Sequence, residues 1–485
     1  MIILQFFHNI GFHNIVFCFV ILYLLFAFTY ASQFSNCDLF DRPSMLPSYN
    51  FFSVFFTVLI FSFFCFDFVV YNKLYFFNQN IQLLFLIFMI GVMYASYDFS
   101  VAKNLFKFEY DLLFIFIILG SLCLCFYNDF LLIYLVIEIQ SLTLYVFATF
   151  HRKSEFATEA GLKYFIFGSI MSCFLLFGFG FIYLLFGSIS FEVISSLVNF
   201  QDDALHCLGF FFVLTVLLFK IGAVPFHIWL CDIYDGSILP VTLLFASAPK
   251  IVLFGLLFKL CFFVFFDYSN VWSILLGGSA VFSIIVGSVS AIYQRRLKRL
   301  FGYSTIAHTG FILLAFLCYN IESSKALIFY IIIYSCLTLL TFSLLINMGL
   351  SNKIQPKYLI NLSATSIQNP IFAAVFSLNI LAVAGIPPLA GFFNKFFMLL
   401  AVIGSEYYLT ALMIILFSSI ACFYYIRLVK IIYFSNSTKN TFWFTNTTKQ
   451  NTDVLIGSLL FLIICYVLYP NLILNCAACI SLALF

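Results

Sequence analysis

The segment that most constrains the fold reads FKIGAVPFHIWLCDIYDG and covers residues 219–236. It places Lys220 inside a long apolar stretch, and Pro225 follows five residues later. An ammonium group is costly in hydrocarbon, so lysines inside a membrane usually face a wet or paired interior. Proline lacks an amide donor and clashes with the preceding turn, which leaves carbonyl oxygens free to meet water. The segment therefore predicts a broken membrane helix that handles an ion.

The composition indicates a membrane protein with many spans. Of the 485 residues, 64% are hydrophobic and only 8% are charged, whereas soluble domains carry about 25% charged residues. We therefore expect an all-α polytopic protein whose main surroundings are the lipid bilayer. The net charge of +3 gives no support for binding to nucleic acid.

Cysteines and cofactor motifs give no sign of redox chemistry on this chain. The 15 cysteines are scattered, and the close pairs Cys123/Cys125 and Cys476/Cys479 lack the further ligands of a metal site. No phosphate loop, dinucleotide fingerprint or haem motif occurs in the sequence. We expect no metal and no cofactor on this polypeptide. The N-terminus lacks a basic region and a cleavage site, which predicts a retained first helix.

Apolar runs of about 17–25 residues can span a bilayer, and the chain contains enough of them for about 14 transmembrane helices. We predict these spans at residues 15–33, 50–71, 81–99, 111–127, 129–150, 161–187, 207–230, 239–266, 271–293, 300–318, 325–348, 370–400, 407–433 and 453–480. The segment 188–206 is expected to be a solvated loop.

The loops carry a strong charge asymmetry. With alternating sides, Lys73 and Lys325 are the only Lys or Arg in the loops on the side of the termini, and all other loop cations lie opposite. Because basic loops stay on the inner side of a membrane, both termini are predicted to face outward.

Several ionisable groups fall within the predicted spans. Lys220 and Lys250 lie near mid-span, where a functional role is favoured over snorkelling. Lys395 follows a second interrupted stretch. For Lys163 a structural role and a functional role are equally plausible, and Lys259 is better explained by snorkelling.

Glu138 and His308 also lie mid-span. Glu138 is either a protonated packing residue or the partner of a lysine on another helix. A lone histidine is usually a satisfied core residue, but Ser304, Thr305 and Thr309 beside His308 could hold water. A proton relay is therefore modestly favoured for His308.

A second broken segment occurs at SLNILAVAGIPPLAGFFNKFFMLL, residues 377–400, where Pro387 and Pro388 interrupt an apolar span. Paired interrupted helices at corresponding positions point to the ion pathway of a repeat-built transporter. The breaks fall in predicted helices 7 and 12, an odd offset that reverses orientation. We therefore expect two inverted five-helix repeats, helices 4–8 and 9–13. The predicted domains are an N-terminal three-helix segment (1–110), a first repeat (111–266), a second repeat (271–433) and a C-terminal helix 14 (453–485).

Several of these motifs, taken together, resemble the antiporter-like subunits of respiratory complex I. The resemblance covers about residues 110–430 and is carried by NDFLLIYLVIEIQSLTLYVFA (128–148), EAGLKYFIFGS (159–169), FKIGAVPFHIWLCDIYDGSILPVT (219–242), APK (248–250), RRLKRLFGYSTIAHTGF (295–311) and AGIPPLAGFFNKF (384–396). Within this family the chain is most similar to the N-type class. HIWLCDIYDGSILP departs from the M and L classes, and Lys395 stands where the M class has a glutamate.

The resemblance implies a non-redox, proton-translocating subunit of the membrane arm of NADH:ubiquinone oxidoreductase. By that resemblance, Glu138 partners Lys220, and the proton passes through Lys250 and His308 to Lys395. Supporting roles are expected for Lys163, Pro225, His227, Pro387 and Pro388. Other membrane-arm subunits would be the partners, and NADH, FMN, iron–sulfur clusters and ubiquinone would be bound elsewhere in the complex. The 72 phenylalanines favour a mitochondrial inner membrane, with the termini on the intermembrane-space side, over a bacterial or plastid membrane.

Two other functions stay open from the residues alone. A cation/proton antiporter outside complex I shares broken helices and buried lysines, although sodium transport would favour more mid-span carboxylates than Glu138. A membrane-arm scaffold with little pumping of its own is the other alternative, and charge-free spans would have favoured it.

Overall fold

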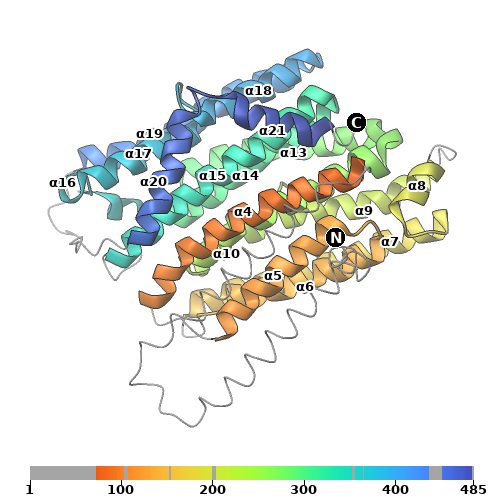
Figure 1. Cartoon of the computed structure of the whole chain (residues 1–485), viewed down its shortest axis with the longest axis horizontal. Helices are drawn as coiled ribbons and strands as arrows, with labels where there is room; N and C mark the ends of the chain where they lie inside the picture. Colours follow the sequence, from red (N-terminus) through yellow and green to blue (C-terminus); the bar gives the residue numbers. More distant parts are fainter. Residues whose placement is uncertain are drawn as a thin grey trace, which may run out of the picture.

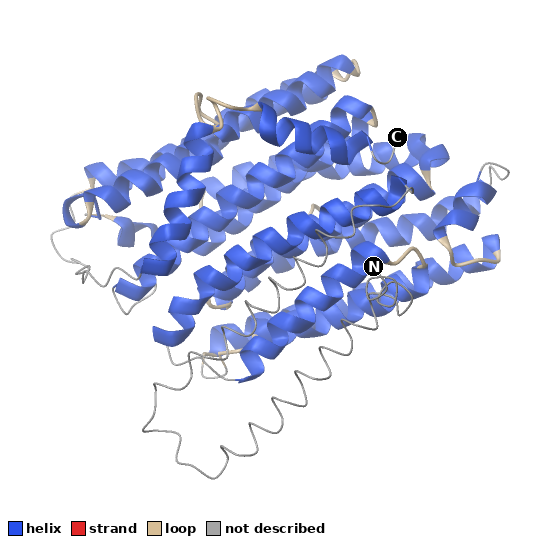
Figure 2. Cartoon of the chain, viewed as in Figure 1, coloured by secondary structure: helices blue, strands red, loops and turns tan. Residues whose placement is uncertain are grey.

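The computed structural model describes residues 73–102, 108–151, 154–198, 204–351, 356–363, 365–435 and 450–482. In these ranges the regular secondary structure is helical, apart from two isolated β-bridges, and loops connect the helices (Figure 2). The helices expected at 15–33 and 50–71 lie outside the described residues, as does most of the predicted N-terminal segment.

The described helices follow one another with short connections. They are α4 (Lys73–Ala102), α5 (Phe108–Phe126), α6 (Phe130–Ala148), α7 (Glu155–Phe186), α8 (Phe191–Val198), α9 (Ala204–Ile221), α10 (Ile228–Gly236), α11 (Leu239–Ala246), α12 (Ala248–Lys259), α13 (Ser269–Ile292), α14 (Leu297–Cys318), α15 (Ile321–Ser351), α16 (Thr365–Gln368), α17 (Pro370–Ala384), α18 (Ala390–Gly404), α19 (Tyr408–Phe434), α20 (Gln450–Cys465) and α21 (Asn471–Leu482). A π-helical turn, η1 (Leu260–Val264), extends α12, and two short 3-10 helices complete the set, η2 (Phe266–Tyr268) and η3 (Leu359–Leu362).

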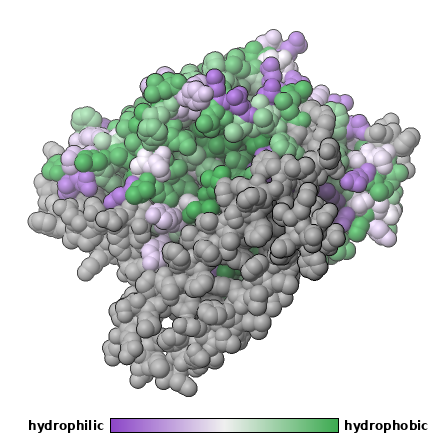
Figure 3. Space-filling model, in the orientation of Figure 1, coloured by the Kyte–Doolittle hydropathy of each residue, from purple (hydrophilic) through white to green (hydrophobic). Residues whose placement is uncertain are grey.

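Nine helical segments of the described chain are long and apolar enough to cross a membrane, and five shorter apolar helices accompany them. The protein is therefore a multi-pass membrane protein. Most of the long helices run side by side, and α4 lies between α5–α12 on one side and α13–α21 on the other (Figure 1). Figure 3 shows a broad apolar surface over the middle of the described helices, with hydrophilic residues mainly towards the rim of the view.

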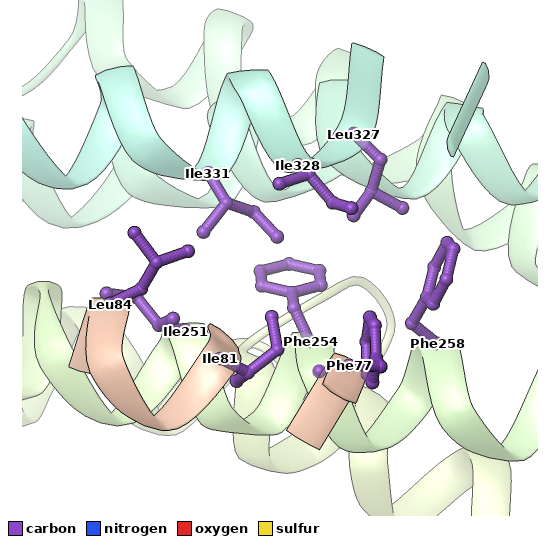
Figure 4. Close-up of a pocket in the computed structure, with 10 residues that line it drawn as sticks. Phe77, Ile81, Leu84, Ile251, Phe254, Phe258, Leu327, Ile328 and Ile331 are labelled. Atoms are coloured by element: carbon purple, nitrogen blue, oxygen red, sulfur yellow. The ribbon is translucent and has the colours of Figure 1, made fainter. Parts of the chain in front are cut away.

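Helix α4 joins the two halves through an apolar contact. Ile81 from α4, Phe254 from α12 and Ile328 from α15 point into one small pocket of about 10 Å³ (Figure 4). Its lining is entirely hydrophobic, so the pocket lacks the polar groups that hold a buried water. At this pocket the halves are therefore held together by apolar packing. Around it, α12, α14 and α15 are almost fully buried, whereas most residues of α7 and α19 are not buried.

The helix breaks predicted from the prolines are confirmed. Pro225 lies between α9 and α10, and Pro387 and Pro388 lie between α17 and α18. The Val224–Pro225 and Pro387–Pro388 peptide bonds are cis.

The first break begins with a glycine in the left-handed region. Gly222 has φ 85°, and the amide of Ala223 donates to the carbonyl of Leu218 at 2.9 Å. This is the hydrogen bond of a Schellman helix end. On the far side of the break, the indole of Trp229 donates to the carbonyl of Phe219 at 2.9 Å. This carbonyl in the last turn of α9 thus has two donors, because it also accepts from the amide of Gly222 at 3.0 Å.

The second break begins in the same way. Gly385 has φ 83°, and the amide of Ile386 donates to the carbonyl of Leu381 at 3.2 Å. Positive φ and the five-residue reach of the hydrogen bond thus recur at both breaks. A glycine stands at each because other residues are strained in this conformation.

Two predicted spans contain another interruption, although the span 239–266 is confirmed as one apolar segment long enough to cross a membrane, Leu239–Val264. The span 239–266 is not one helix, since Ser247 leaves helical geometry (φ −113°, ψ −91°) between α11 and α12. Pro249, in the first turn of α12, lacks the amide that would continue α11. The span 453–480 is divided around Pro470 into α20 and α21, and the chain changes direction between them (Figure 1).

The segment 188–206 is not a simple solvated loop. It contains the short helix α8, whose Phe191, Ile194 and Val198 are buried while its polar residues face outward. This amphipathic spacing anchors the connection against the helix bundle.

Candidate functional site

The five ionisable residues predicted to form the site lie on five different helices. Glu138 is on α6, Lys220 on α9, Lys250 on α12, His308 on α14 and Lys395 on α18. Lys250 and His308 are buried, and the other three are partly buried. The helix breaks position the three lysines, because Lys220 is in the last turn of α9, Lys250 in the first turn of α12, and Lys395 just after the second break.

A small cavity connects Lys220 with Lys250. Its volume is about 20 Å³, and Gln140, Ser141 and Tyr164 line it together with the two lysines. A buried water needs about 10–15 Å³ and a few polar partners. The cavity therefore has the size and lining to place one water between the two ammonium groups.

Glu138 lies near this cavity but forms no ion pair with Lys220. Within the described ranges no carboxylate oxygen comes within 4.0 Å of Lys220 Nζ. The Oε2 atom of Glu138 accepts a weak hydrogen bond from Ser141 Oγ at 3.4 Å, and its Oε1 is buried without a partner. The carboxylate is therefore only loosely held in this conformation.

Lys250 and Lys259 lie on the same helix, α12, but differ in whether their ammonium groups have hydrogen-bond partners. Lys250 Nζ is buried and, among the described residues, has no hydrogen-bond partner. Lys259 Nζ donates to the carbonyls of Cys125 and Tyr127, at 3.1 and 2.9 Å. Lys259 is also buried, so the expectation that it snorkels to the membrane surface is wrong. It ties α12 to the end of α5 instead.

His308 is held by two tyrosines from neighbouring helices. Its Nδ1 lies 2.8 Å from the hydroxyl of Tyr330 on α15, and its Nε2 lies 3.4 Å from the hydroxyl of Tyr425 on α19. The Tyr334 ring packs against the imidazole with 5.0 Å between the ring centroids. Phenol hydroxyls both donate and accept, so each ring nitrogen of His308 has a group with which to exchange a proton.

The hydroxyl residues expected to assist His308 serve their own helix. Ser304, Thr305 and Thr309 donate to the carbonyls of Phe301, Gly302 and Ile306, one turn back along α14, at 2.7, 2.7 and 2.8 Å.

Lys395 reaches back across the second break. Its Nζ donates to the carbonyl of Ala384, the last residue of α17, at 2.6 Å, and lies 5.7 Å from the centroid of the Phe311 ring. Gly385 leaves room for this approach, since a Cβ there would lie 3.2 Å from Lys395 Nζ. The lysine thus satisfies the helix end that the break exposes.

Lys163 lies apart from the buried residues. It pairs with Glu159 at 2.7 Å and with Asp232 at 3.2 Å, and its side chain is 42% exposed. Arg299 Nη2 also donates a hydrogen bond to Asp232 Oδ1, at 3.3 Å. Asp235 continues this network, and the charged cluster, as we name it, consists of Lys163, Asp232, Asp235, Arg296 and Arg299.

The charged cluster fastens α7, α10 and α14 together at one end of the bundle. Asp235 accepts a hydrogen bond from Arg296 and forms an ion pair with Arg299, whose Nε lies 3.0 Å from the carboxylate. The hydrogen bond from Arg296 to Asp235 raises the pKa of the guanidinium further above its ordinary value. His227, predicted to support the path, is partly buried where α10 begins, and its Nδ1 has no partner in the described structure.

Sequence reasoning did not identify the tyrosines or the acidic half of the charged cluster. A signal for the tyrosines was present, because Tyr330 and Tyr334 are one turn apart in an apolar helix and Tyr424 and Tyr425 are adjacent in another. A buried tyrosine hydroxyl usually needs a polar partner. Across the described residues, no group of three or more His, Cys, Asp or Glu is placed to hold a metal ion.

The chain is similar to known proteins in sequence and in fold. Residues 127–424 match the family described as NADH:quinone oxidoreductase/Mrp antiporter, TM. The chain is 36% identical over 412 residues to NADH-ubiquinone oxidoreductase chain 2 of Marchantia polymorpha, covering 83% of each. It is 34% identical over 362 residues to NADH-quinone oxidoreductase subunit N of Parvibaculum lavamentivorans, covering 74% of this chain and 75% of the other. The fold is similar to that of a chain of respiratory complex I from Thermus thermophilus, with a TM-score of 0.76, 24% identity, and coverage of 96% and 98%.

Proposed function

The chain belongs to the NADH:quinone oxidoreductase/Mrp antiporter family, among the relatives called chain 2 and subunit N, and from that premise we propose a proton path through its buried residues. The chain is a proton-translocating subunit of the membrane arm of complex I, and other membrane-arm subunits are its partners. The proposed path runs from Lys220 through Lys250 and His308 to Lys395, with Glu138 controlling the first lysine.

The unpartnered ammonium of Lys250 carries this proposal. A buried cation without a partner costs several kcal/mol, and such a group persists when function requires it. Lys250 shares a cavity with Lys220, so a proton can pass between them through one water. Beyond Lys250, the two tyrosines around His308 supply exchangeable protons on the way to Lys395.

Glu138 supplies a means of driving the first step. Moving one proton against about 150 mV costs about 3.5 kcal/mol. A carboxylate at 4 Å stabilises an ammonium by about 4 kcal/mol at an effective dielectric constant of about 20. Approach of Glu138 to Lys220 would therefore bind a proton, and withdrawal would release it. The loose contact of Glu138 with Ser141 leaves the carboxylate free to make this movement.

The matching helix ends at the two breaks support the proposed inverted repeats. Gly222 and Gly385 begin the breaks with positive φ, and both are followed by an amide that reaches back five residues. We assign the repeats to predicted helices 4–8 (111–266) and 9–13 (271–433), within about 14 spans. The segments 1–110 and 453–485 would flank them.

The cellular setting follows from the family and the composition. We place the chain in the mitochondrial inner membrane, with both termini on the intermembrane-space side, because relatives include plant chain 2 proteins and the loop charges are strongly biased. The enzyme activity belongs to the whole complex. NADH, FMN, iron–sulfur clusters and ubiquinone would be used by other subunits, and this chain would carry no cofactor.

Substitution of the two gating residues tests the proposal. Glu138→Gln and Lys220→Met should each lower proton pumping per NADH oxidised while the complex still assembles. Pumping is measured with a pH-sensitive dye in membrane vesicles, and assembly by native gel electrophoresis with NADH dehydrogenase staining. Glu192→Gln and Lys430→Met are matched controls, since both side chains are exposed. Normal pumping in both test variants would refute the path.

The same gel separates this function from the two alternatives. Recovery of the chain in the large NADH-oxidising band identifies a complex I subunit. Recovery only in a small inactive band would favour an independent antiporter. If the complex assembles and pumping stays normal when each buried lysine is replaced, the chain is better explained as a scaffold.

A further inference from the structure

A second polar site lies at one end of the bundle, away from the proton path. It is a pocket of about 470 Å³ between the first turns of α7 and α14 and the connection from α10 to α11. The charged residues on its wall are Asp235, Arg296, Lys298 and Lys357. This volume is typical of pockets that bind small molecules.

The cations of this pocket are fixed in place by the backbone. The strand-like segment around Tyr358 pairs with the segment around Arg296. The amide of Leu297 donates to the carbonyl of Lys357, and the amide of Leu359 donates to the carbonyl of Arg295, both at 3.0 Å. Arg296 and Lys357 are therefore held side by side although they are far apart in sequence.

Aromatic and buried surroundings add to this fixation. Arg296 and Lys357 both lie 6.0 Å from the centroid of the Phe156 ring. Lys298 is only 7% exposed, and its Nζ donates to the carbonyl of Ser237 at 2.5 Å. Ordering these side chains in advance lowers the entropy that a ligand would otherwise lose on binding.

The pocket has more positive charge than its own residues balance. Among the described residues of its wall, Asp235 is the only carboxylate, and it is already shared between Arg296 and Arg299. No carboxylate within the described ranges lies in ion-pair contact with Lys298 or Lys357. Like charges brought together in a partly buried pocket repel one another unless an anion joins them.

The helix ends around the pocket favour an anion as well. Two helices start on its wall, α7 after Ser154 and α14 after Arg296, and neither of these side chains caps the first amides. A helix N-terminus carries a partial positive charge, which disfavours the basic residues Arg296 and Lys298 placed there. The first amide of α14 is taken up by the carbonyl of Lys357, but the amides that follow it have no side-chain cap. Uncapped amides and basic side chains together form a typical setting for phosphate.

We propose that this pocket binds a phosphate group, supplied either by the headgroup of an anionic lipid or by free phosphate. Arg296 and Lys357 contact the phosphate oxygens, and the buried Lys298 adds positive charge to the pocket wall. Apolar side chains on the same wall, Phe99, Phe156 and Ile238, suit the non-polar part of a lipid. Basic pockets between transmembrane helices are known to take lipid headgroups.

The test measures ligand binding to the purified, delipidated complex. The probes are inorganic phosphate, short-chain phosphatidic acid and short-chain phosphatidylcholine, with bound phosphorus read by native mass spectrometry or a radiolabel. We expect phosphatidic acid or inorganic phosphate to bind in preference to phosphatidylcholine, and the anion that binds at lower concentration identifies the source. Lys357→Gln should weaken that binding about tenfold, the equivalent of one charged hydrogen bond.

Lys357 suits this test because it is exposed at the pocket rim and its backbone, not its side chain, makes the β-bridge. Lys357→Arg should restore binding, and Lys430→Gln, an exposed lysine on α19, is the matched control. Equal binding by the wild type and Lys357→Gln would overturn the proposal. Equal binding of phosphatidylcholine and phosphatidic acid, with no binding of phosphate, would overturn it too.

Discussion

Two lysines on α12 should respond in opposite ways to replacement by methionine. Lys250 and Lys259 are both buried, and methionine has nearly the length of lysine without its charge. Lys250 Nζ has no hydrogen-bond partner in the described structure, whereas Lys259 Nζ donates to the carbonyls of Cys125 and Tyr127. The first substitution therefore removes a costly charge, and the second removes two hydrogen bonds.

The magnitudes follow from these contacts. A lysine in the centre of a membrane helix costs about 2.5–3.5 kcal/mol, so Lys250→Met should leave the complex as stable as the wild type or more stable. Lys259→Met leaves two carbonyls without their donor, at about 1–3 kcal/mol for each buried group. It also removes the contact between Lys259 Nζ and the Phe191 ring, 5.5 Å to the centroid, worth about 0.5–2 kcal/mol. The two variants should differ by several kcal/mol in stability.

Stability and pumping have to be measured on the same membranes. Stability is taken as the half-time of thermal inactivation of NADH oxidation and as the amount of complex on a native gel, and pumping as dye quenching per NADH oxidised. We expect Lys250→Met to assemble normally and pump poorly. We expect Lys259→Met to assemble poorly, while the complexes that do form pump normally.

Two results would refute this reasoning. Undiminished pumping by Lys250→Met would show that the unpartnered ammonium is not on the proton path. A stable Lys259→Met complex with defective pumping would show that Lys259 conducts protons and does not simply tie α12 to α5.

Three further substitutions test other parts of the structure. Tyr330→Phe removes the hydroxyl beside His308 Nδ1 and should lower pumping about tenfold, because about 1.4 kcal/mol is lost. Native gels should show normal assembly, and unchanged pumping would exclude this tyrosine from the path. Gly391→Ala should destabilise the second break by about 1–3 kcal/mol or more, because its Cβ would lie 1.8 Å from a backbone carbonyl oxygen. Gly404→Ala is the control, since a Cβ there would meet nothing within 4 Å, and equal rates of thermal inactivation of the two variants would contradict the close packing at Gly391. Asp232→Asn breaks two partly exposed ion pairs and should cost less than about 1 kcal/mol, with an effect that shrinks at high salt; a salt-independent loss of pumping would show that Asp232 has a direct role.

The two proline-marked helix breaks could be predicted from the sequence because charge and proline are both costly inside a membrane. A lysine or a proline in an apolar run needs a local reason, and the breaks beside Lys220 and Lys395 were therefore visible as patterns. The break at Ser247 was missed, although Pro249 marks it. The hydrophobic run continues through that position, and periodicity alone does not distinguish one helix from two short ones.

The partners of the buried residues could not be predicted in the same way. Tyr330 and Tyr425 reach His308 from helices that follow it at different distances along the chain, so only packing brings the three together. The nearer hydroxyls, such as Thr305, were the more obvious candidates by sequence, but they bond to their own helix. Whether Lys259 is free or bound depends likewise on the end of α5, which is far from it in sequence.

The exposed helix ends at the two breaks also have an electrostatic consequence. The aligned peptide dipoles of a helix place about half a negative charge at its C-terminus. Lys220 stands in the last turn of α9, and Lys395 bonds to the final carbonyl of α17. Each of these ammonium groups is therefore stabilised by the negative C-terminal end of a helix dipole. Lys250 lies near the start of α12, where the helix dipole is positive and does not stabilise an ammonium group. For the proposed path this makes Lys250 the lysine that holds its proton least tightly, between two lysines that hold theirs more tightly.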